Sequence, residues 1–180
     1  MTRAVRTPAG FRPVLAVALV LTLVAGGFAA WAGRDWYAAA HDDSAAYAAE
    51  RDRALAAGEQ AVQNLNTLDH RRVDQGLDLW ESSTTGDLHR QLVDGREEFA
   101  GQVEAAKTVT KARVLSGAVT ELDDRAGRAR LLVALRVTVT TPDAKSTEKD
   151  SRMLAELTRT DGRWKLSGLG QAPVGGTATG

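Results

Sequence analysis

The chain has 180 residues, of which 23 are acidic and 23 are basic, so its formal net charge at neutral pH is zero. A balanced charge gives no basic field of the kind that attracts nucleic acid, and no nucleic-acid partner is expected. The sequence contains no cysteine, which excludes disulfide bonds, thiolate metal sites and a cysteine nucleophile. The fold must therefore be stabilised by its hydrophobic core.

Residues 13–33 form one uncharged, largely apolar run, preceded by Arg3, Arg6 and Arg12 and followed by Arg34. Its length fits a transmembrane helix, because roughly 20 residues at about 1.5 Å rise per residue cross the hydrocarbon core of a bilayer. Basic residues on a short N-terminal tail favour a cytoplasmic position for that tail. We therefore predict a single-pass protein of the cell membrane that contacts the lipid bilayer through residues 13–33. Its N-terminus is cytoplasmic and everything after Arg34 is extracytoplasmic.

The same segment also has the order of regions found in a cleaved signal peptide, in which a basic part, an apolar part and small residues follow one another. Ala30, Trp31 and Ala32 fit the cleavage pattern. The apolar run is longer than the roughly 7 to 15 residues of a usual signal core, which favours the uncleaved anchor. Cleavage near Ala32 stays open as an alternative, and in both interpretations the rest of the chain is exported.

Hydrophobic spacing behind the apolar run predicts three helices. The first covers residues 44–66. Its apolar stripe consists of Ala48, Leu55, Val62 and Leu65, and the polar residues placed away from the stripe are Glu50, Arg53, Gln60 and Gln63. The second helix covers residues 72–80. The third covers residues 87–106, where Gly95 and Gly101 weaken the helical pattern.

After Lys107 the spacing changes to the alternation typical of β-strands. Strands are predicted over residues 108–120, 128–141, 151–160 and 163–168, with a polar connection over residues 143–150. Asp161 and Gly162 give a hairpin-turn signal, since both residue types tolerate positive φ. In the last strand Trp164 and Leu166 alternate with polar residues, so both are expected to point into the core.

Helices followed by an antiparallel meander define an α+β fold class, here a cone-shaped roll of about three helices packed on a curved antiparallel sheet of about four strands. The chain is thereby divided into five segments. They are a cytoplasmic basic tail (residues 1–12), a transmembrane helix (13–33), a juxtamembrane linker (34–43), the extracytoplasmic roll (44–171) and a disordered tail (172–180).

The histidines do not define a metal or catalytic site. His41 lies beside Asp42 and Asp43, but three adjacent residues cannot surround one metal ion without distortion. His70 belongs to a charged loop between two helices. His89 falls off the apolar stripe of its helix and is expected on the surface.

The carboxylates and tyrosines give no placed acid-base pair. Glu97 and Glu98 are neighbours whose side chains diverge by about 100° on a helix, so they cannot share one substrate. Curved α+β sheets include ketosteroid isomerases and SnoaL-like cyclases, which need a carboxylate base and an acid donor inside the cone. Here Tyr37 and Tyr47 lie at the membrane exit and on the first helix. We therefore predict no catalytic, cofactor-binding or metal-binding residue, and a protein that is not an enzyme.

Several short motifs resemble, in their order and spacing, those of the actinobacterial Mce-associated membrane proteins, small single-span proteins encoded with Mce lipid-import systems. They are NLNTLD at residues 64–69, TGD at 85–87, the valine-rich strand at 131–139 and DGRW at 161–164, together with the basic tail and single span. The resemblance implies a cystatin-like, nuclear-transport-factor-like α+β roll outside the membrane. It also implies an accessory role in a lipid or steroid importer, without catalytic residues.

We therefore expect a non-enzymatic, membrane-anchored accessory subunit that stabilises an Mce-type lipid or sterol import complex of the cell envelope. Its expected partners are importer subunits or other membrane and envelope proteins, with lipid or sterol as a further candidate. Two alternatives stay open. One is an extracytoplasmic carrier that holds a lipid or small ligand between helices and sheet. The other is a bitopic assembly subunit of a type IV secretion-like machine.

Overall fold

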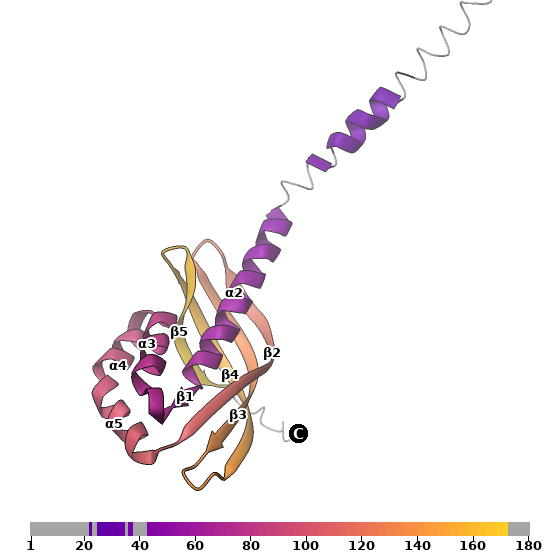
Figure 1. Cartoon of the computed structure of the whole chain (residues 1–180). Coiled ribbons are helices and arrows are strands. Elements are labelled where there is room, and N and C mark those ends of the chain that lie inside the picture. Colours follow the sequence, from indigo (N-terminus) through magenta and orange to yellow (C-terminus); the bar gives the residue numbers. More distant parts are fainter. Residues whose placement is uncertain (1–21, 23–24, 35, 38–42, 173–180) are drawn as a thin grey trace, which may run out of the picture. The chain divides into compact units, whose positions relative to one another are not determined.

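The computed structural model describes residues 22, 25–34, 36–37 and 43–172 (Figure 1). The chain divides into two units, Met1–Ala46 and Tyr47–Gly180, and each is described by itself. In the first unit the described residues before residue 38 are helical and exposed. The rings of Phe28 and Trp31 lie 5.9 Å apart there.

The predicted basic tail (1–12) and half of the predicted transmembrane segment (13–21 and 23–24) lie outside the described residues. In the part of the chain that is described, no helix is both long enough and apolar enough to cross a membrane. Most of the predicted C-terminal tail also lies outside the described residues. Its first residue is an exception, because the Ala172 N–H donates to Arg152 O at 2.9 Å.

The second unit consists of one antiparallel sheet and two groups of helices, which confirms the predicted α+β class (Figure 1). The helices are α2 (Asp43–Leu65), α3 (Val73–Ser83), α4 (Gly86–Asp94) and α5 (Arg96–Ala106), with a short 3-10 helix, η1, at His70–Arg72. The strands are β1 (Leu68–Asp69), β2 (Val109–Asp123), β3 (Arg128–Thr140), β4 (Ser146–Thr160) and β5 (Arg163–Gln171). The five strands pair in chain order, each antiparallel to the next.

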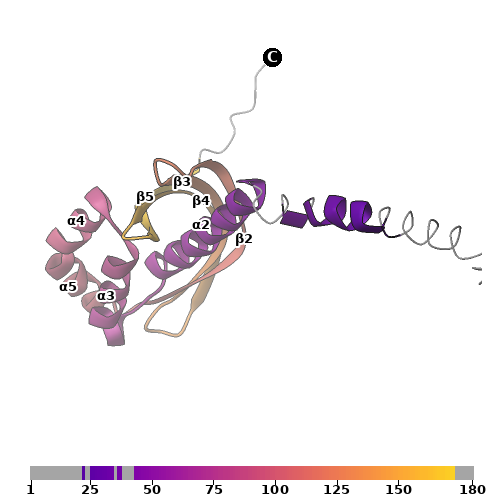
Figure 2. The same cartoon turned by 90° about the horizontal axis from the view of Figure 1, so that it is seen from above.

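The two groups of helices occupy different places around the sheet. α2 runs along one face of the curved sheet, whereas α3, α4 and α5 form a separate helical layer next to β5 (Figure 2). The layer is joined to β5 by an isolated parallel bridge between Thr84 and Leu166, and the Thr85 N–H donates to Leu166 O at 2.9 Å. The side of the helical layer that faces away from β5 is therefore available for other contacts.

The third predicted helix, residues 87–106, is two helices that meet at Gly95. The backbone of Gly95 has φ −91° and ψ 1°, which interrupts the helical path between α4 and α5. The Gly95 N–H still donates to Gln91 O at 3.1 Å, and the Phe99 N–H donates to Gly95 O at 3.0 Å. Glycine has little helix propensity, so the chain changes direction at this residue.

The predicted polar connection over residues 143–150 is wrong for its second half, because β4 begins at Ser146. The first residues of β4 pair with the end of β3, as Thr140 with Ser146 and Arg136 with Asp150. Arg136 Nε also donates to Asp150 Oδ1 at 2.7 Å. These residues are polar on both faces of the sheet, so the sequence lacks the alternation that marks a half-buried strand. β1 was also missed, since two residues carry no pattern.

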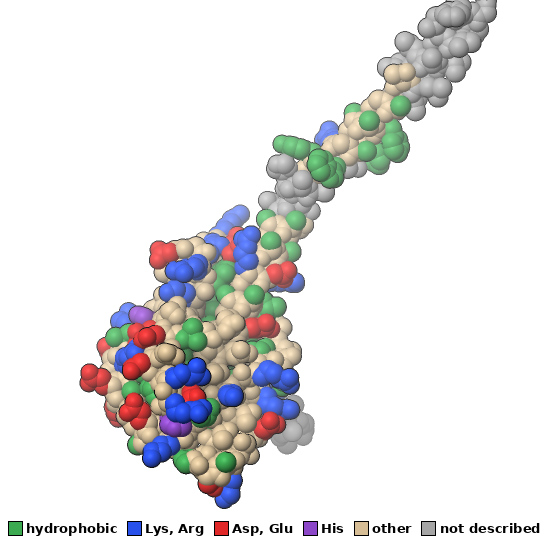
Figure 3. All heavy atoms as spheres, in the orientation of Figure 1, with side chains coloured by type: hydrophobic (Ala, Val, Ile, Leu, Met, Phe, Trp, Pro, Cys, Tyr) green, Lys and Arg blue, Asp and Glu red, His purple; other side chains and the backbone are tan. Residues whose placement is uncertain are grey.

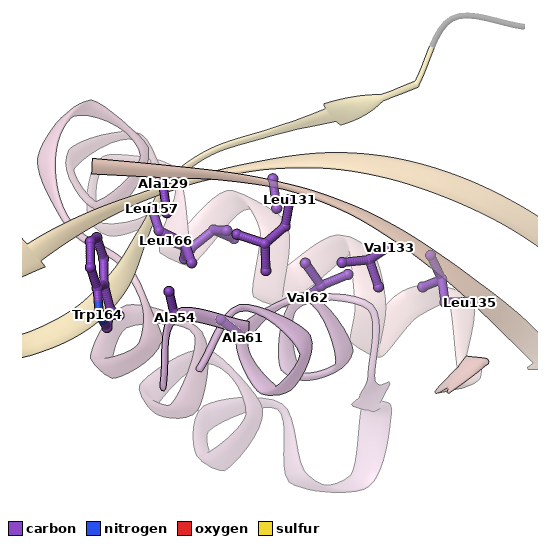
Figure 4. Packing of buried hydrophobic residues seen from close by; sticks show 11 residues of the cluster. Ala54, Ala61, Val62, Ala129, Leu131, Val133, Leu135, Leu157, Trp164 and Leu166 are labelled. Atoms are coloured by element: carbon purple, nitrogen blue, oxygen red, sulfur yellow. The ribbon is translucent and has the colours of Figure 1, made fainter. Parts of the chain in front are cut away.

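The main core lies between α2 and strands β3, β4 and β5 (Figure 4). Its buried members are Ala54, Ala61, Val62, Ala129, Leu131, Val133, Leu135, Ala155, Leu157, Trp164 and Leu166. The predicted inward positions of Trp164 and Leu166 are confirmed, since their exposed fractions are 9% and 0%. Along β3, the alternate residues Leu131, Val133 and Leu135 are buried, so one face of this strand packs against α2.

α2 does not use the predicted stripe as its buried face. Of that stripe, only Val62 is fully buried, and Ala48 is exposed. The helix instead approaches the sheet through small residues, above all Gly58, where an added Cβ would lie 2.4 Å from Leu131 Cδ2. Small side chains let a helix backbone come close to a sheet, so the buried face carries fewer large residues than a hydrophobicity pattern expects.

A second, smaller core holds the helical layer together. Its buried members are Leu68, Val73, Leu77 and Trp80, with Leu65, Leu92, Ala100 and Val103 packed around them. This cluster is separate from the core beneath α2. The helical layer therefore has a buried cluster of its own, which Leu65 at the end of α2 connects to the main core.

Candidate interaction surface

The two described histidines make local contacts with backbone carbonyls. His70 Nδ1 lies 3.2 Å from Thr108 O, and His89 Nδ1 lies 3.1 Å from Glu81 O. The predicted surface position of His89 is wrong, because the residue is half-buried at the corner between α3 and α4. His41 lies outside the described residues.

The structure does not bring the other candidate residues together. Glu97 and Glu98 are exposed on α5, and the exposed Tyr47 donates from its hydroxyl to Leu122 O at 3.4 Å. Tyr37 belongs to the first unit. Among the described residues, no group of three or more histidine, aspartate or glutamate side chains has the arrangement of a metal site.

Glu50 on α2 is a buried carboxylate that the sequence pattern had placed on the polar face. Its Oε1 accepts hydrogen bonds from Trp164 Nε1 at 2.8 Å and from Arg159 Nη1 at 3.0 Å. Its Oε2 accepts from Arg53 Nη1 at 2.7 Å. Arg159 Nη1 also donates to Asp124 Oδ1 at 2.7 Å, and the guanidinium carbon lies 5.4 Å from the Trp164 ring centre. The network joins α2 to β4, β5 and the turn between β2 and β3.

Burial by itself raises the pKa of Glu50, but the hydrogen bonds from Trp164, Arg159 and Arg53 outweigh it and hold the pKa below its usual value. A carboxylate with a lowered pKa and several donors is a weak base at neutral pH. We therefore assign Glu50 to structure. Its four-residue spacing from Ala54 and Gly58 places all three on one helix face, a signal that outlines the buried face before the structure is seen.

An open depression of about 550 Å³ lies beside this network. Three arginines contribute to its lining, namely Arg53, Arg159 and Arg163. The first two are already paired with carboxylates of the network. The positive charge of the depression is therefore largely compensated by the protein itself, which makes it a weak site for an anion.

A different hollow lies in the helical layer, between α3 and the junction of α4 with α5. Its volume is about 290 Å³, and its floor consists of Leu77, Trp80, Leu92 and Phe99. Leu77 and Trp80 are buried, whereas Phe99 exposes 38% of its surface. The polar residues at its edge are Gln91, Arg96, Glu98 and Gln102. We call this hollow the α3–α5 groove.

Arg96, the first residue of α5, fixes the width of the α3–α5 groove. Its Nη1 lies 2.5 Å from Glu81 Oε1, and its Nη2 lies 2.8 Å from Asp78 Oδ1 and 3.3 Å from Asp74 Oδ1. These three carboxylates belong to α3, and Glu81 and Asp78 raise the pKa of Arg96 most. The ion pairs hold the start of α5 against α3, while the turn at Gly95 directs α4 away.

The floor of the groove is positioned by Trp80. Its Nε1 donates to Asn64 O at 2.8 Å, and its ring lies 5.3 Å from the ring of Phe99 at a tilt of 43°. The same two rings also line a second hollow of about 290 Å³, to which Leu68 and Val103 contribute. Trp80 and Phe99 therefore contribute to two hollows, of which the α3–α5 groove is mainly apolar and the second also has polar lining residues, Asn66, Thr108 and Thr110.

The helical layer is strongly acidic although the whole chain is neutral. Residues 73–106 contain eight acidic and two basic side chains, a net charge of −6, so the rest of the chain carries +6. Acidic side chains gather on the side of the molecule formed by α3, α4 and α5 (Figure 3). The α3–α5 groove thus has an apolar floor and belongs to an acidic layer, from which Glu98 reaches its edge.

The space between α2 and the sheet, which a carrier would need as a cavity, is filled where α2 lies closest to the sheet. At Gly58 the helix contacts Leu131, and an added Cβ would also lie 3.0 Å from Leu157 Cδ1. Val62, Leu131 and Leu157 are all essentially inaccessible to solvent. At this point, therefore, no space for a carried ligand is left between α2 and the sheet.

A helical layer beside a five-stranded antiparallel sheet, with one long helix across the sheet, is an α+β architecture similar to that of solved VirB8 proteins. The chain belongs to the family described as "Uncharacterized protein Rv1363c/MT1408-like", which it matches over residues 13–173. No curated protein sequence matches the chain.

Three solved structures share the fold at low sequence identity. An IcmL-like type IV secretion system protein from Legionella pneumophila has a TM-score of 0.55 and 12% identity, over 69% of this chain and 93% of that chain. The periplasmic domain of DotI has a TM-score of 0.55 and 17% identity, over 74% and 96%. CagV from Helicobacter pylori, a VirB8 homologue, has a TM-score of 0.50 and 13% identity, over 66% and 95%. At these identities the likeness concerns the fold alone.

Proposed function

We propose that the protein is a membrane-anchored assembly subunit whose extracytoplasmic domain binds other proteins of an envelope complex through the α3–α5 groove. The observation that carries the proposal is the groove itself, an apolar hollow in a separate helical layer. Its floor includes Phe99, a large aromatic residue that is more than one third exposed. Aromatic residues in partly open pockets are the usual anchors of protein interfaces.

The chemistry of the charged residues supports a binding role. Glu50 and Arg159 are held in the network with Trp164, and Arg96 is held by three carboxylates of α3. Charged groups held in this way stabilise the fold, and they are poorly suited to act as acids or bases in a reaction. A tether to the membrane would raise the effective concentration of the domain near other membrane proteins, which favours binding as its work.

The membrane anchor is part of the proposal and depends on the sequence. Residues 13–33 are uncharged and long enough to cross a bilayer, and the basic tail favours the cytoplasm. The similar solved structures include an IcmL-like type IV secretion system protein and the periplasmic domain of DotI, which supports a bitopic assembly subunit over a carrier. The motifs that resemble Mce-associated proteins make an Mce-type importer one candidate host complex. The likeness to solved type IV secretion system proteins gives more support to the other candidate, a type IV secretion-like machine.

Copurification of the full-length protein from its native membrane tests the proposal. We expect the protein, gently solubilised, to retain a defined set of envelope proteins, and we expect this set to be lost when residues 35–171 are deleted. The double substitution Leu92→Ser and Phe99→Ser removes apolar groups from the groove without adding charge, and it should lower retention strongly. The subunits retained, importer or secretion channel, identify the host complex.

The matched control is Leu115→Ser with Leu132→Ser. Both residues are exposed on the sheet, with exposed fractions of 43% and 37%, close to the 38% of Phe99. The control should retain the partners at the level of the unchanged protein. Equal retention by the groove variant and the control, at equal protein levels, would contradict the assignment of the groove.

A further inference from the structure

We infer that the segment received by the α3–α5 groove is a basic amphipathic helix of a partner protein. The inference rests on the proposed function, and it adds the chemical class of the partner. It follows from three features of the helical layer, namely its charge, the positions of its acidic residues and the shape of its hollows.

The charge of the layer is unevenly compensated. Among the described residues, the ion pairs of α3, α4 and α5 join Arg96 to three carboxylates of α3 and Arg90 to Asp87. Four further acidic residues take no part in these ion pairs. They are Asp94, Glu97, Glu98 and Glu104, and all four are exposed.

In the sequence, these four residues are close to residues that line the groove. Asp94 ends α4, Glu97 and Glu98 are in the first turn of α5 and Glu104 is near its end. Glu98 contributes directly to the lining. A basic side chain beside the groove would therefore meet carboxylates that the protein leaves without a cation, and such complementarity selects partners and speeds their association.

The shape of the hollows fits side chains better than an enclosed small molecule. Each hollow, at about 290 Å³, is at the lower end of the roughly 300–1,000 Å³ range of small-molecule sites. The two hollows are neighbours, because Trp80 and Phe99 line both of them. Two apolar side chains on one face of a helix, three or four residues apart, would each enter one hollow, as in other complexes of a helix with a groove.

The negative charge also excludes other occupants. An anionic membrane surface and a nucleic acid would both be repelled by a layer with a net charge of −6 over residues 73–106. A neutral apolar helix would enter the hollows without using Glu97, Glu98 or Glu104. A basic amphipathic helix would fill the hollows with its apolar side chains and would pair its basic side chains with these carboxylates.

A binding measurement with the full-length protein in neutral phosphatidylcholine nanodiscs tests the inference. The probes are three fluorescent helical peptides of roughly 18 residues, or five turns, composed of Leu with Lys, Leu with Gln or Leu with Glu. Empty nanodiscs give the background. We expect the Leu and Lys peptide to bind best, and we expect its affinity to fall as NaCl is raised from about 0.05 M to about 0.5 M, because salt screens exposed charges.

Charge reversal locates the site. The triple variant Glu97→Lys, Glu98→Lys and Glu104→Lys should lower the affinity for the Leu and Lys peptide about tenfold or more, if each exposed pair contributes as such pairs usually do. The control, Glu121→Lys, Glu148→Lys and Glu156→Lys, makes the same change of charge at exposed positions of the sheet. The control should lower the affinity less than threefold by the same reasoning. Unchanged melting temperatures show that both variants fold.

Several results would overturn the inference. They are equal binding of the three peptides, equal effects of the two triple variants, preferential binding to phosphatidylglycerol vesicles, and occupation of the groove by a second copy of the chain in sedimentation. If the Leu92→Ser and Phe99→Ser variant loses its native partners while the Glu97, Glu98 and Glu104 variant keeps them, the proposed function stands and the basic partner is wrong. If the groove variant keeps them, the proposed function itself fails.

Discussion

At the residue scale, Trp164 joins packing to ion pairing. Its ring is buried against α2, and its Nε1 donates to Glu50. Replacing a buried tryptophan by alanine leaves a cavity and here also removes a hydrogen bond to a buried carboxylate. We expect Trp164→Ala to lower the free energy of unfolding by about 3–5 kcal/mol in a urea titration. A loss below about 1 kcal/mol would contradict the buried position of the ring.

Glu50 should make the stability depend on pH. Its folded-state pKa lies below its ordinary value of 4.5, so its ionised form stabilises the fold above that pH. This contribution is lost as the pH falls through the lowered folded-state pKa. We expect Glu50→Gln to lower the unfolding free energy by about 1–3 kcal/mol at pH 7, and we expect the difference from the unchanged protein to shrink below about pH 4.

Urea titrations between pH 7 and pH 3 measure this dependence. Glu97→Gln is the control, because Glu97 is exposed and makes no ion pair among the described residues. The free energy of unfolding of Glu97→Gln should stay within about 0.5 kcal/mol of the value for the unchanged protein at each pH. A difference between Glu50→Gln and the unchanged protein that stayed constant down to pH 3 would show that the charge of Glu50 does not stabilise the fold.

At the scale of elements, α2 depends on its close approach to the sheet. Gly58→Ala should destabilise the domain by about 1–3 kcal/mol, because the new methyl group would collide with Leu131. In a helix without such a neighbour the same change is favourable by up to about 1 kcal/mol. Gly101 on α5 has no atom within 4 Å of an added Cβ, so Gly101→Ala is the matched control and should stabilise the protein. Thermal unfolding of the two variants measures the contrast, and equal shifts would contradict the close packing at Gly58.

The elements show where sequence reasoning succeeds and where it stops. Alternation along residues 163–168 and the Asp161–Gly162 turn placed Trp164 correctly, because these signals are local. The strand that begins at Ser146 depends on backbone pairing with β3, which a local pattern does not contain. Gly95 weakened the predicted third helix, but the hydrophobic spacing did not show that the chain turns there. Glu50 was placed on the wrong face because donors from Trp164 and Arg159, which are distant in the sequence, allow its burial together with Arg53 of its own helix. The α3–α5 groove is lined by residues of α3, α4 and α5, so the hydrophobic pattern of any one of these segments does not predict it.

At the scale of the whole molecule, the predicted topology can be tested directly because the chain contains no cysteine. Single cysteines introduced at Thr7 and Thr177 should react differently with a membrane-impermeant thiol reagent added to intact cells. We expect only the cysteine at position 177 to react, because the basic tail should be cytoplasmic. Labelling at position 7 alone would reverse the orientation. A mature protein that begins at Gly33 would show that the apolar run is a cleaved signal.

The account as a whole depends on the α3–α5 groove being a contact surface in the cell. The most direct measurement is site-specific photo-cross-linking in living cells, with a photoreactive residue at Leu92 in the groove and, as the control, at Leu132 on the sheet. Position 92 should give cross-links to one or a few envelope proteins that position 132 does not give. Cross-links of the same pattern from both positions, or none from position 92 at normal protein levels, would contradict the claim that the groove is a contact surface.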